Sequence, residues 1–432
     1  MDQAPEADSG TPSRRTSLWR HRDFRLLWAG DVVSVFGFSL VGLAIPLLAL
    51  QLLEADAFEM GLLTALENLA FLLIGLPAGA LVDRWLKRRV LIWGDLTRGA
   101  MLLSIPIAWW LGVLTLPQVY VVVFLVGCVT VFFDVANQSY LPELVPSDAI
   151  SEGNAKLQAT QQVAQVGGPS IAAVMVRFLG SPLTIALTSI CMAASALFVS
   201  RIRTEDRRPE RVEGSRLRSE IAEGLQFVVR HPLLIRITAC TGLSNFATSL
   251  SGGLFVLYVV RTLGLSETTL GLVFSTFAAG GLIGAVTSDR IARLLGEGRS
   301  IPISALFMAV TMVSTPLAAY VSPAPVLLVG GFLSGYAMVV YNVVQVSFRQ
   351  RLCPPALLGR MNASIRFMVW GPMPVGAFVG GILGAQVGVV PALWVSVALG
   401  FVGALPVLLS PLNRMGDLPR ELEAVDTTTH KM

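Results

Sequence analysis

The chain has 432 residues, of which 54% are hydrophobic and only 14% are charged, against roughly 25% charged residues in an ordinary soluble domain. The formal net charge is +4 and the pI is near 9.0. This composition excludes a typical soluble protein and indicates an integral membrane protein. The excess of basic residues is explained by membrane topology and does not indicate nucleic acid binding.

Long apolar runs support this conclusion. No charged residue occurs in 113–133, 301–348 or 371–412, and each run reaches the roughly 20 residues that a helix needs to cross a bilayer. The runs lack the period-two alternation of a barrel strand, so we expect an all-α membrane protein. Twelve spans are predicted, at 26–53, 60–82, 90–112, 118–140, 157–179, 182–200, 233–260, 268–288, 301–321, 325–348, 361–386 and 389–410.

A polar connection at 201–230 divides the spans six and six. It holds eight arginines and six acids, which predicts a solvated linker, partly helical around 216–229. The expected organisation is an N-terminal tail at 1–25, a six-helix bundle at 26–200, a linker at 201–232, a second six-helix bundle at 233–411 and a C-terminal tail at 412–432.

Lys and Arg near span ends are retained on the cytoplasmic side of a membrane. Basic residues cluster in the N-terminal tail, at 84–89, in the linker and at 290–299 and 349–360, whereas only Arg177 and Arg261 fall near the other ends. We therefore expect a multi-pass protein of the inner (plasma) membrane with both termini in the cytoplasm.

The two halves resemble each other. Residues such as His21, Ser34 and Phe36 recur 210 positions later, and five residues recur with a shift of 208: Ser139, Leu144, Pro146, Asn154 and Ala155. Because each half has an even number of spans, both halves have the same orientation, which is a parallel repeat about an axis along the membrane normal. This geometry encloses a central cavity between two bundles.

The second span ends in the residues GLPAGALVDRWLKRR at 75–89. This stretch resembles the loop signature G-x-x-x-D-R-x-G-R-R of the major facilitator superfamily, and Asp289-Arg290 forms a degenerate copy. An ordinary basic loop is the alternative. The resemblance implies a twelve-helix fold of two parallel-repeat bundles, with cytoplasmic gating and locking residues. The locking residues are Gly79, Asp83, Arg84, Arg88, Asp289 and Arg290. At the cytoplasmic end of the fourth span, Asp134 is expected to form a gate between the halves with Arg360 or Arg366 of the eleventh span, and a fixed helix-end charge is the alternative.

The stretch 132–146 and two Gly-Pro pairs resemble the branch of enterobactin exporters and macrolide efflux proteins. The resemblance implies export of an amphipathic drug, antibiotic or siderophore by proton antiport and alternating access. The pairs, Gly168-Pro169 and Gly371-Pro372, are expected to serve helix packing and kinks. An uptake carrier or a lipid flippase of the same fold is the alternative, and a non-transporting membrane sensor is a further one.

Carboxylates inside a span are costly and need a reason. Glu67 and Asp31 are the candidates for proton coupling, because burial brings the titration of a carboxylate towards neutral pH. The alternatives are a carboxylate bonded to a neighbouring helix for Glu67 and a gating role for Asp31. Asp95 and Arg98, one turn apart, are expected to neutralise each other.

Four glutamines recur at helical spacing in the fifth span, which places them on one face. They predict a substrate-cavity wall, with amides of the second half opposite: Gln158, Gln161, Gln162, Gln165, Asn245, Asn342 and Gln345. No catalytic constellation, metal cluster or phosphate-binding GxxxxGK[ST] motif is present. We therefore expect a transporter and not an enzyme, active as a monomer with a small-molecule substrate and membrane lipid as partners, without cofactor and driven by the proton gradient.

Overall fold

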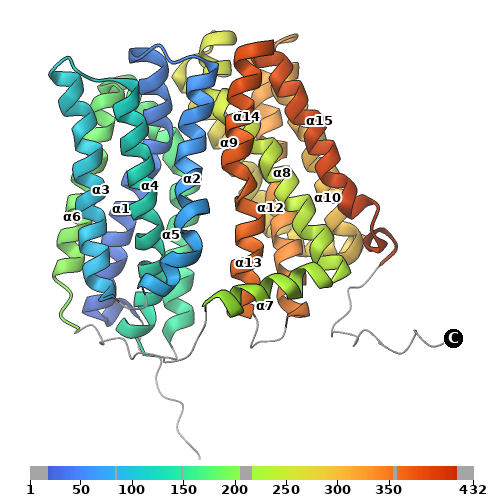
Figure 1. Cartoon of the computed structure of the whole chain (residues 1–432), viewed down its shortest axis with the longest axis horizontal. Coiled ribbons are helices and arrows are strands. Elements are labelled where there is room, and N and C mark those ends of the chain that lie inside the picture. The colour runs from blue at the N-terminus through green and yellow to red at the C-terminus, as the bar shows by residue number, and fades with distance from the viewer. Residues whose placement is uncertain (1–17, 83–84, 147–148, 205–216, 354–357, 416–432) are drawn as a thin grey trace, which may run out of the picture.

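A computed structural model of the chain describes residues 18–82, 85–146, 149–204, 217–353 and 358–415. The described residues form two helical bundles that stand side by side (Figure 1). The N-terminal bundle, blue to green, contains α1 (Arg22–Leu52), α2 (Ala57–Val82), α3 (Lys87–Trp110), α4 (Leu116–Leu144), α5 (Ile150–Leu179) and α6 (Ser181–Ser200).

Several crossings of the C-terminal bundle are made of two consecutive helices. The bundle contains α8 (Pro232–Leu257) with the π-helix η3 (Tyr258–Thr262), α9 (Glu267–Leu295), α10 (Glu297–Met312) with α11 (Ser314–Leu317), α12 (Pro323–Leu352), α13 (Leu358–Trp370) with α14 (Pro372–Val387), and α15 (Val389–Leu408). Short 3-10 turns, η1 (Leu18–Arg20) and η5 (Pro411–Arg414), flank the bundles.

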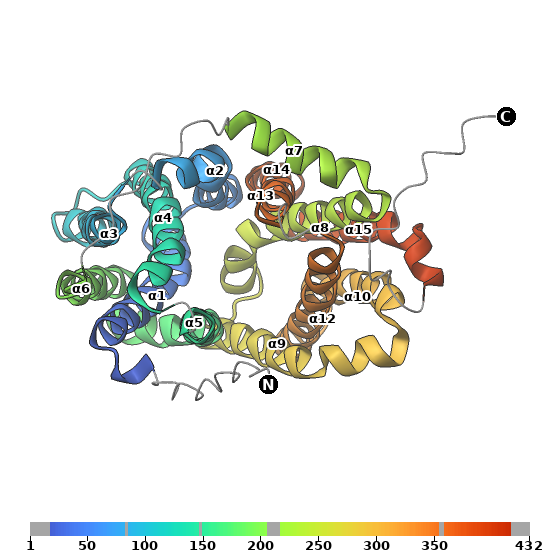
Figure 2. The same cartoon turned by 90° about the horizontal axis from the view of Figure 1, so that it is seen from below.

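Helix α7 (Leu217–Arg230) lies across one end of the molecule, as Figures 1 and 2 show. This end, which we name the α7 face, also carries the described ends of the chain. The other end is named the opposite face. The helix that the linker composition predicts around 216–229 is therefore present.

The helices agree with the predicted spans, but several continue further. Hydropathy identifies the apolar part of a helix, whereas α5 begins at Ile150 and α9 ends at Leu295, in polar sequence. Eleven helices in the described part of the chain are long and apolar enough to cross a membrane. Helix α5 supplies the twelfth crossing; only its end, Gly167–Leu179, is apolar, because the glutamines occupy its first half.

The backbone shows the repeat directly. His21 and His231, 210 residues apart, cap the first helix of each bundle by accepting a hydrogen bond at Nδ1 from the backbone three residues later. Burial lowers the pKa of His231, which favours the neutral ring that this bond requires. Gly180 and Gly388, 208 residues apart, both have positive φ, at 80° and 92°, in the turns before α6 and α15. The two halves therefore share local geometry as well as topology.

The buried core has two different arrangements along the membrane normal. One large apolar cluster includes residues of both bundles, such as Leu43, Leu254 and Leu270. Two further clusters are each confined to one bundle: one surrounds Phe24 and Tyr140, the other Phe348. The bundles thus share a core towards the opposite face and have separate cores towards the α7 face.

Candidate functional site

Small residues bring the bundles into contact on the side of the opposite face. A Cβ atom added to Gly61 of α2 would overlap the backbone of Gly381 on α14, and one added to Gly381 would lie 3.0 Å from the carbonyl oxygen of Phe58. A Cβ on Gly271 of α9 would lie 2.6 Å from Cβ of Ala173 on α5. These helices approach as closely as small residues allow, so no space remains between them for a solute.

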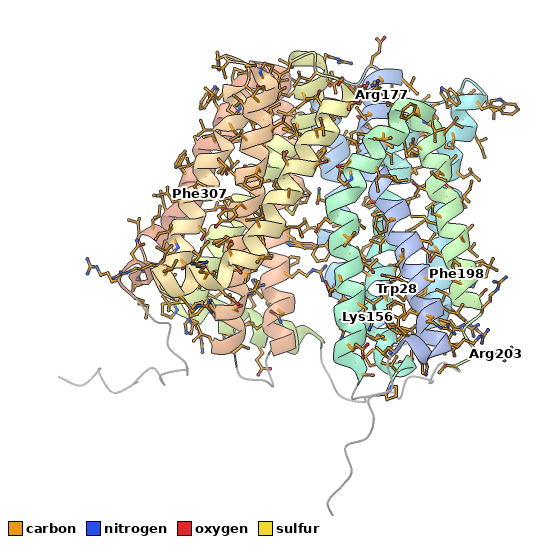
Figure 3. The ribbon with its side chains drawn as sticks, turned by 180° about the vertical axis from the view of Figure 1, so that it is seen from behind. Trp28, Lys156, Arg177, Phe198, Arg203 and Phe307 are labelled. Carbon is orange, nitrogen blue, oxygen red and sulfur yellow. The ribbon has the colours of Figure 1, made fainter. Side chains whose placement is uncertain are left out.

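Polar contacts join the bundles near the same face. Arg261 of η3 donates to the carbonyl oxygens of Ala55 and Leu50, each at 3.0 Å. Arg177, which Figure 3 shows at this end of α5, donates to Oγ1 of Thr268 at 3.0 Å. The two arginines that are exceptions to the predicted charge pattern therefore hold the bundles together.

A buried acid lies inside the N-terminal bundle. Asp31 of α1 is 3% exposed, and its Oδ1 accepts a 2.8 Å hydrogen bond from Nδ2 of Asn137 on α4. Its Oδ2 has no hydrogen-bond partner among the described residues. A buried carboxylate oxygen without a partner is costly, so protonation of this oxygen would relieve the cost.

Beside Asp31, α3 carries a fixed ion pair. Nη2 of Arg98 lies 2.5 Å from Oδ1 of Asp95, which also accepts a 2.9 Å hydrogen bond from Ser34. The guanidinium lies 3.9 Å from the ring centroid of Phe133. Both charged residues are almost completely buried, so they stabilise one bundle internally, as their spacing predicts.

Glu67 has a different environment. It lies on α2 between the surface that packs against α4, marked by Ala70, and the surface that meets the C-terminal bundle, marked by Phe71. Its side chain is half-buried, and its carboxylate has no hydrogen-bond or ion-pair partner among the described residues. Glu67 is therefore an uncompensated acid that faces the inter-bundle region at mid-depth.

Opposite charges face each other across the bundles. Asp134 of α4 and Arg366 of α13 are exposed and within electrostatic range, but they form no ion pair. The Arg366 guanidinium instead lies 5.0 Å from the ring centroid of Phe71 and 4.4 Å from that of Trp370. The region between these residues and the α7 face, where the two cores are separate, is named the gap.

The glutamines of α5 face the gap. Gln158 and Gln165 are exposed and Gln161 is half-buried. Gln165 lies two turns before Ala172 and Gln158 lies five turns before Val176, and both of these residues are buried towards the opposite face. The side of α5 that is packed near the opposite face is thus exposed near the α7 face. Thr160, which accepts a 3.1 Å hydrogen bond from Nε1 of Trp28, fixes a different side of α5 to α1.

The amides of the C-terminal bundle are more deeply placed than the glutamines. Asn245 donates from Nδ2 to the carbonyl oxygen of Val369 at 2.8 Å, beside the break between α13 and α14. Gln345 is 2% exposed and donates to Oδ1 of Asn342 at 3.3 Å. In this conformation Gln345 is buried within its own bundle and does not line the gap.

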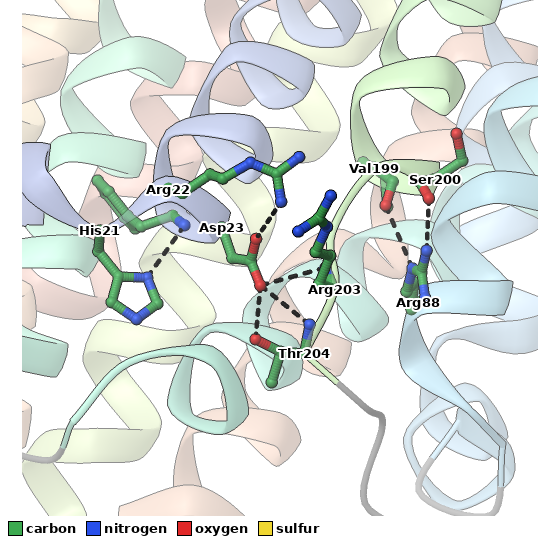
Figure 4. Close-up of polar contacts among 9 residues, drawn as sticks. His21, Arg22, Asp23, Arg88, Val199, Ser200, Arg203 and Thr204 are labelled. Atoms are coloured by element: carbon green, nitrogen blue, oxygen red, sulfur yellow. Dashed lines mark hydrogen bonds and ion pairs between the residues drawn. The ribbon is translucent and has the colours of Figure 1, made fainter.

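The expected locking residues lie near the α7 face. Arg88 donates to the carbonyl oxygens of Val199 and Ser200 at 3.2 and 2.5 Å, which joins α3 to the end of α6 (Figure 4). Asp289 and Arg290 are exposed near the end of α9. Asp83 and Arg84 lie outside the described residues, and the surroundings of Gly79 and the side chains of Gln162 and Arg360 are also not described.

Asp23 connects two further elements at this face. Its Oδ2 accepts hydrogen bonds from the backbone nitrogens of Arg203 and Thr204 at 3.2 and 2.9 Å, and from Oγ1 of Thr204 at 2.7 Å (Figure 4). Together with Arg88, Asp23 ties α1, α3 and α6 to one another within one bundle. These bonds stabilise the N-terminal bundle internally at the α7 face.

The two Gly-Pro pairs differ in structure. Helix α5 continues through Gly168-Pro169, where a Cβ atom on Gly168 would overlap the side chain of Ser39 on α1. Gly371-Pro372 instead marks the boundary between α13 and α14. The first pair therefore permits close packing, and the second coincides with a break.

Sequence reasoning missed several residues of this region. Asn137 was not singled out, although the repeat pairs it with Gln345 at a shift of 208. Gly61 matches Gly271 in the repeat, but its role and that of Phe71 depend on contacts between bundles, which the sequence does not reveal. Within the described residues, no group of three or more His, Cys, Asp or Glu is placed to hold a metal ion.

Comparison with known proteins agrees with this geometry. Residues 15–427 match the family described as transmembrane secretion effector, MFS_3. The chain is 26% identical to the multidrug efflux pump Tap of Mycolicibacterium fortuitum, over 88% of this chain and 93% of Tap. It is 25% identical to the enterobactin exporter EntS of Citrobacter koseri, over 93% of this chain and 94% of EntS.

Solved structures show the same fold. A bacterial homologue of the iron transporter ferroportin in its inward-facing state superposes with a TM-score of 0.73 at 18% identity, covering 91% of this chain and 99% of that one. The outward-facing state of such a homologue gives 0.58. The chain is therefore a member of the major facilitator superfamily, a multi-pass membrane transporter and not an enzyme, in the family of transmembrane secretion effectors.

Proposed function

We propose that this protein exports a small amphipathic molecule by alternating access, in exchange for protons. One observation carries the proposal: the bundles share a core towards the opposite face and have separate cores, with a polar gap between them, towards the α7 face. A binding region that is closed at one end and hydrated at the other is one half of an alternating-access cycle.

The α7 face is proposed to be cytoplasmic. Basic residues at the ends of α3 and α9 lie at this face, among them Lys87, Arg89 and Arg293, whereas Arg177 and Arg261 at the opposite face contact the other bundle. The positive-inside rule then places both termini inside the cell. The gap in this conformation would receive substrate from the cytoplasm or the inner leaflet.

Glu67 and Asp31 are proposed to carry the exchanged proton. Glu67 has no described partner, and Asp31 has one unpartnered oxygen. Keeping either buried carboxylate ionised costs free energy. Protonation removes this cost, and opening of the gap to water changes it. No cofactor is required for this exchange, and a single chain holds both bundles and the whole gap.

The names of the relatives support an amphipathic substrate. Tap is a multidrug efflux pump and EntS exports enterobactin. The gap combines amides and carboxylates with aromatic side chains such as Trp370, which suits a molecule with both polar and apolar surface.

An accumulation assay in a pump-deficient bacterium tests the proposal, with a panel of dyes, tetracyclines and macrolides. We expect the intact protein to lower accumulation of at least one compound and Glu67→Gln to abolish export against a gradient. Glu54→Gln is the matched control, because Glu54 is an exposed residue of the turn before α2 and should export normally.

Inside-out vesicles with an imposed pH gradient give the direction of transport. Substrate should enter these vesicles when their lumen is acidic, and Asp31→Asn should reduce this uptake. Full export by Glu67→Gln and Asp31→Asn would refute proton coupling through these acids, as would a sodium requirement without pH dependence. Movement only in the reverse direction would identify an uptake carrier.

A further inference from the structure

Arg366 lies beside two aromatic rings that come from different bundles. Phe71 belongs to α2 and Trp370 to α13, and their ring centroids are 4.7 Å apart with an interplanar angle of 55°. The guanidinium lies within 5.0 Å of both centroids, inside the roughly 6 Å range of cation–π attraction. The ring pair is therefore occupied by a cation that the protein itself supplies.

This occupancy is not fixed by other bonds. Arg366 forms no hydrogen bond or ion pair with the described residues, and both it and Trp370, which is 40% exposed, reach the gap. Arg98 shows the contrasting case, since Asp95 holds it in place at 2.5 Å. Arg366 is thus free to leave the ring pair when another cation competes for it.

The charges around the ring pair favour a cation. Glu67 lies one helical turn before Phe71 on the same side of α2 and has no partner. Asp134 faces the gap without an ion pair and interacts at a distance with Arg98 and Arg366, and Arg98 is itself paired with Asp95. Among the described residues near the ring pair, Glu67 and Asp134 are two acids without an ion pair, and both lie on the side of the gap opposite Arg366.

We propose that Phe71 and Trp370 form a binding site for a lipophilic cation, and that Arg366 occupies this site in its absence. This inference rests on the proposed function and names the substrate class: an amphipathic molecule with an ammonium, phosphonium or amidinium centre. When the substrate enters, it displaces the guanidinium from the rings. Arg366 then moves to Asp134, and the new ion pair draws α13 towards α4 and narrows the gap.

Two probes of equal shape and opposite charge test the site: tetraphenylphosphonium and tetraphenylborate. Binding is measured by equilibrium dialysis on the purified full-length protein. Phe71→Leu and Trp370→Leu should each weaken tetraphenylphosphonium binding by about 3- to 30-fold, the range expected for loss of a cation–π contact. Arg366→Ala should tighten it, because the competing cation has been removed.

Phe58 and Phe378 supply a matched control. They also form an aromatic pair between α2 and the C-terminal bundle, with centroids 5.9 Å apart, but no guanidinium lies over them among the described contacts. Phe58→Leu should leave tetraphenylphosphonium binding unchanged. If Phe71→Leu does not fold, as judged by its elution profile and thermal unfolding, Trp370→Leu carries the same test.

Weaker tetraphenylphosphonium binding by Arg366→Ala, or unchanged binding by both ring variants, would overturn the proposal. Tighter binding of tetraphenylborate, lost in Arg366→Ala, would also overturn it and would identify the guanidinium as an anion site. The result of this binding test can be distinguished from the result of the export test for proton coupling. Full export by Glu67→Gln with the expected probe binding would reject the coupling residue and retain the cation site.

Discussion

The two ends of the inter-bundle interface differ in chemistry. Towards the opposite face, contact is made by glycines such as Gly61 and Gly381 and by arginines that donate to backbone carbonyls. Towards the α7 face, Asp134, Arg366 and the glutamines of α5 face the gap. A contact between small residues can part without leaving a buried charge unpaired, whereas the charges at the other end gain partners only when the gap closes. This difference is what a reversible two-ended gate requires.

The largest effect on stability is expected for Arg98, a charged residue that is paired within one bundle and takes no part in opening or closing the gap. Arg98→Ala would leave Asp95 buried without its partner, which costs about 3–5 kcal/mol, so the thermal unfolding temperature in detergent should fall sharply. Arg366→Ala removes a guanidinium with no ion pair and should change it little. Equal losses for the two variants would mean that Arg366 also is a structural residue.

Gly61→Val tests the contact towards the opposite face. The added side chain would meet the backbone of Gly381, and overpacking costs about 1–3 kcal/mol, which corresponds to about a 5- to 150-fold shift of a two-state equilibrium. We expect loss of transport and, when Gln165→Cys is introduced as a reporter in the gap, greater labelling of this cysteine from outside the cell. Gly42→Val is the control, since no atom lies within 4 Å of a Cβ at Gly42; a similar defect in it would implicate helix propensity instead.

The arginines of the opposite face should have the smallest effect. Arg261→Gln removes two hydrogen bonds between bundles, and a net loss of about 1 kcal/mol would shift the equilibrium about fivefold. Arg177→Gln removes one exposed bond and should shift it less. The population of the state that is open outwards, measured by single-molecule fluorescence, ranks the two variants. The reverse order would show that α5 and α9 carry more of the contact than η3.

The fold could be predicted from the sequence because local features, namely apolar runs and the charges at their ends, are enough to predict membrane helices. Uncharged runs fixed the crossings, and charge at their ends indicated the orientation. The span predicted at 157–179 includes the glutamines of α5, but not the polar first turns of this helix from Ile150 onwards. The break at Gly371 was expected only as a kink, since hydropathy does not distinguish a bent helix from an interrupted one.

The site could be predicted only in part. Asp95 and Arg98 are neighbours along one helix, so their spacing alone predicts the ion pair. The sequence indicates Asp31 because a carboxylate within a membrane span is energetically unfavourable. Its partner Asn137 is 106 residues away, and no sequence pattern distinguishes it from other amide residues. The contact of Arg366 with Phe71 depends on how two bundles are placed relative to each other, which no local pattern records.

Paired distances between spin labels test alternating access most directly. One pair, at Asn154 and Arg293, reports on the α7 face, and the other, at Leu111 and Tyr320, reports on the opposite face; all four residues are exposed. When tetraphenylphosphonium is added, the first distance should shorten while the second lengthens. Two distances that stay constant, or that change in the same direction, would contradict a carrier that opens its two ends in turn.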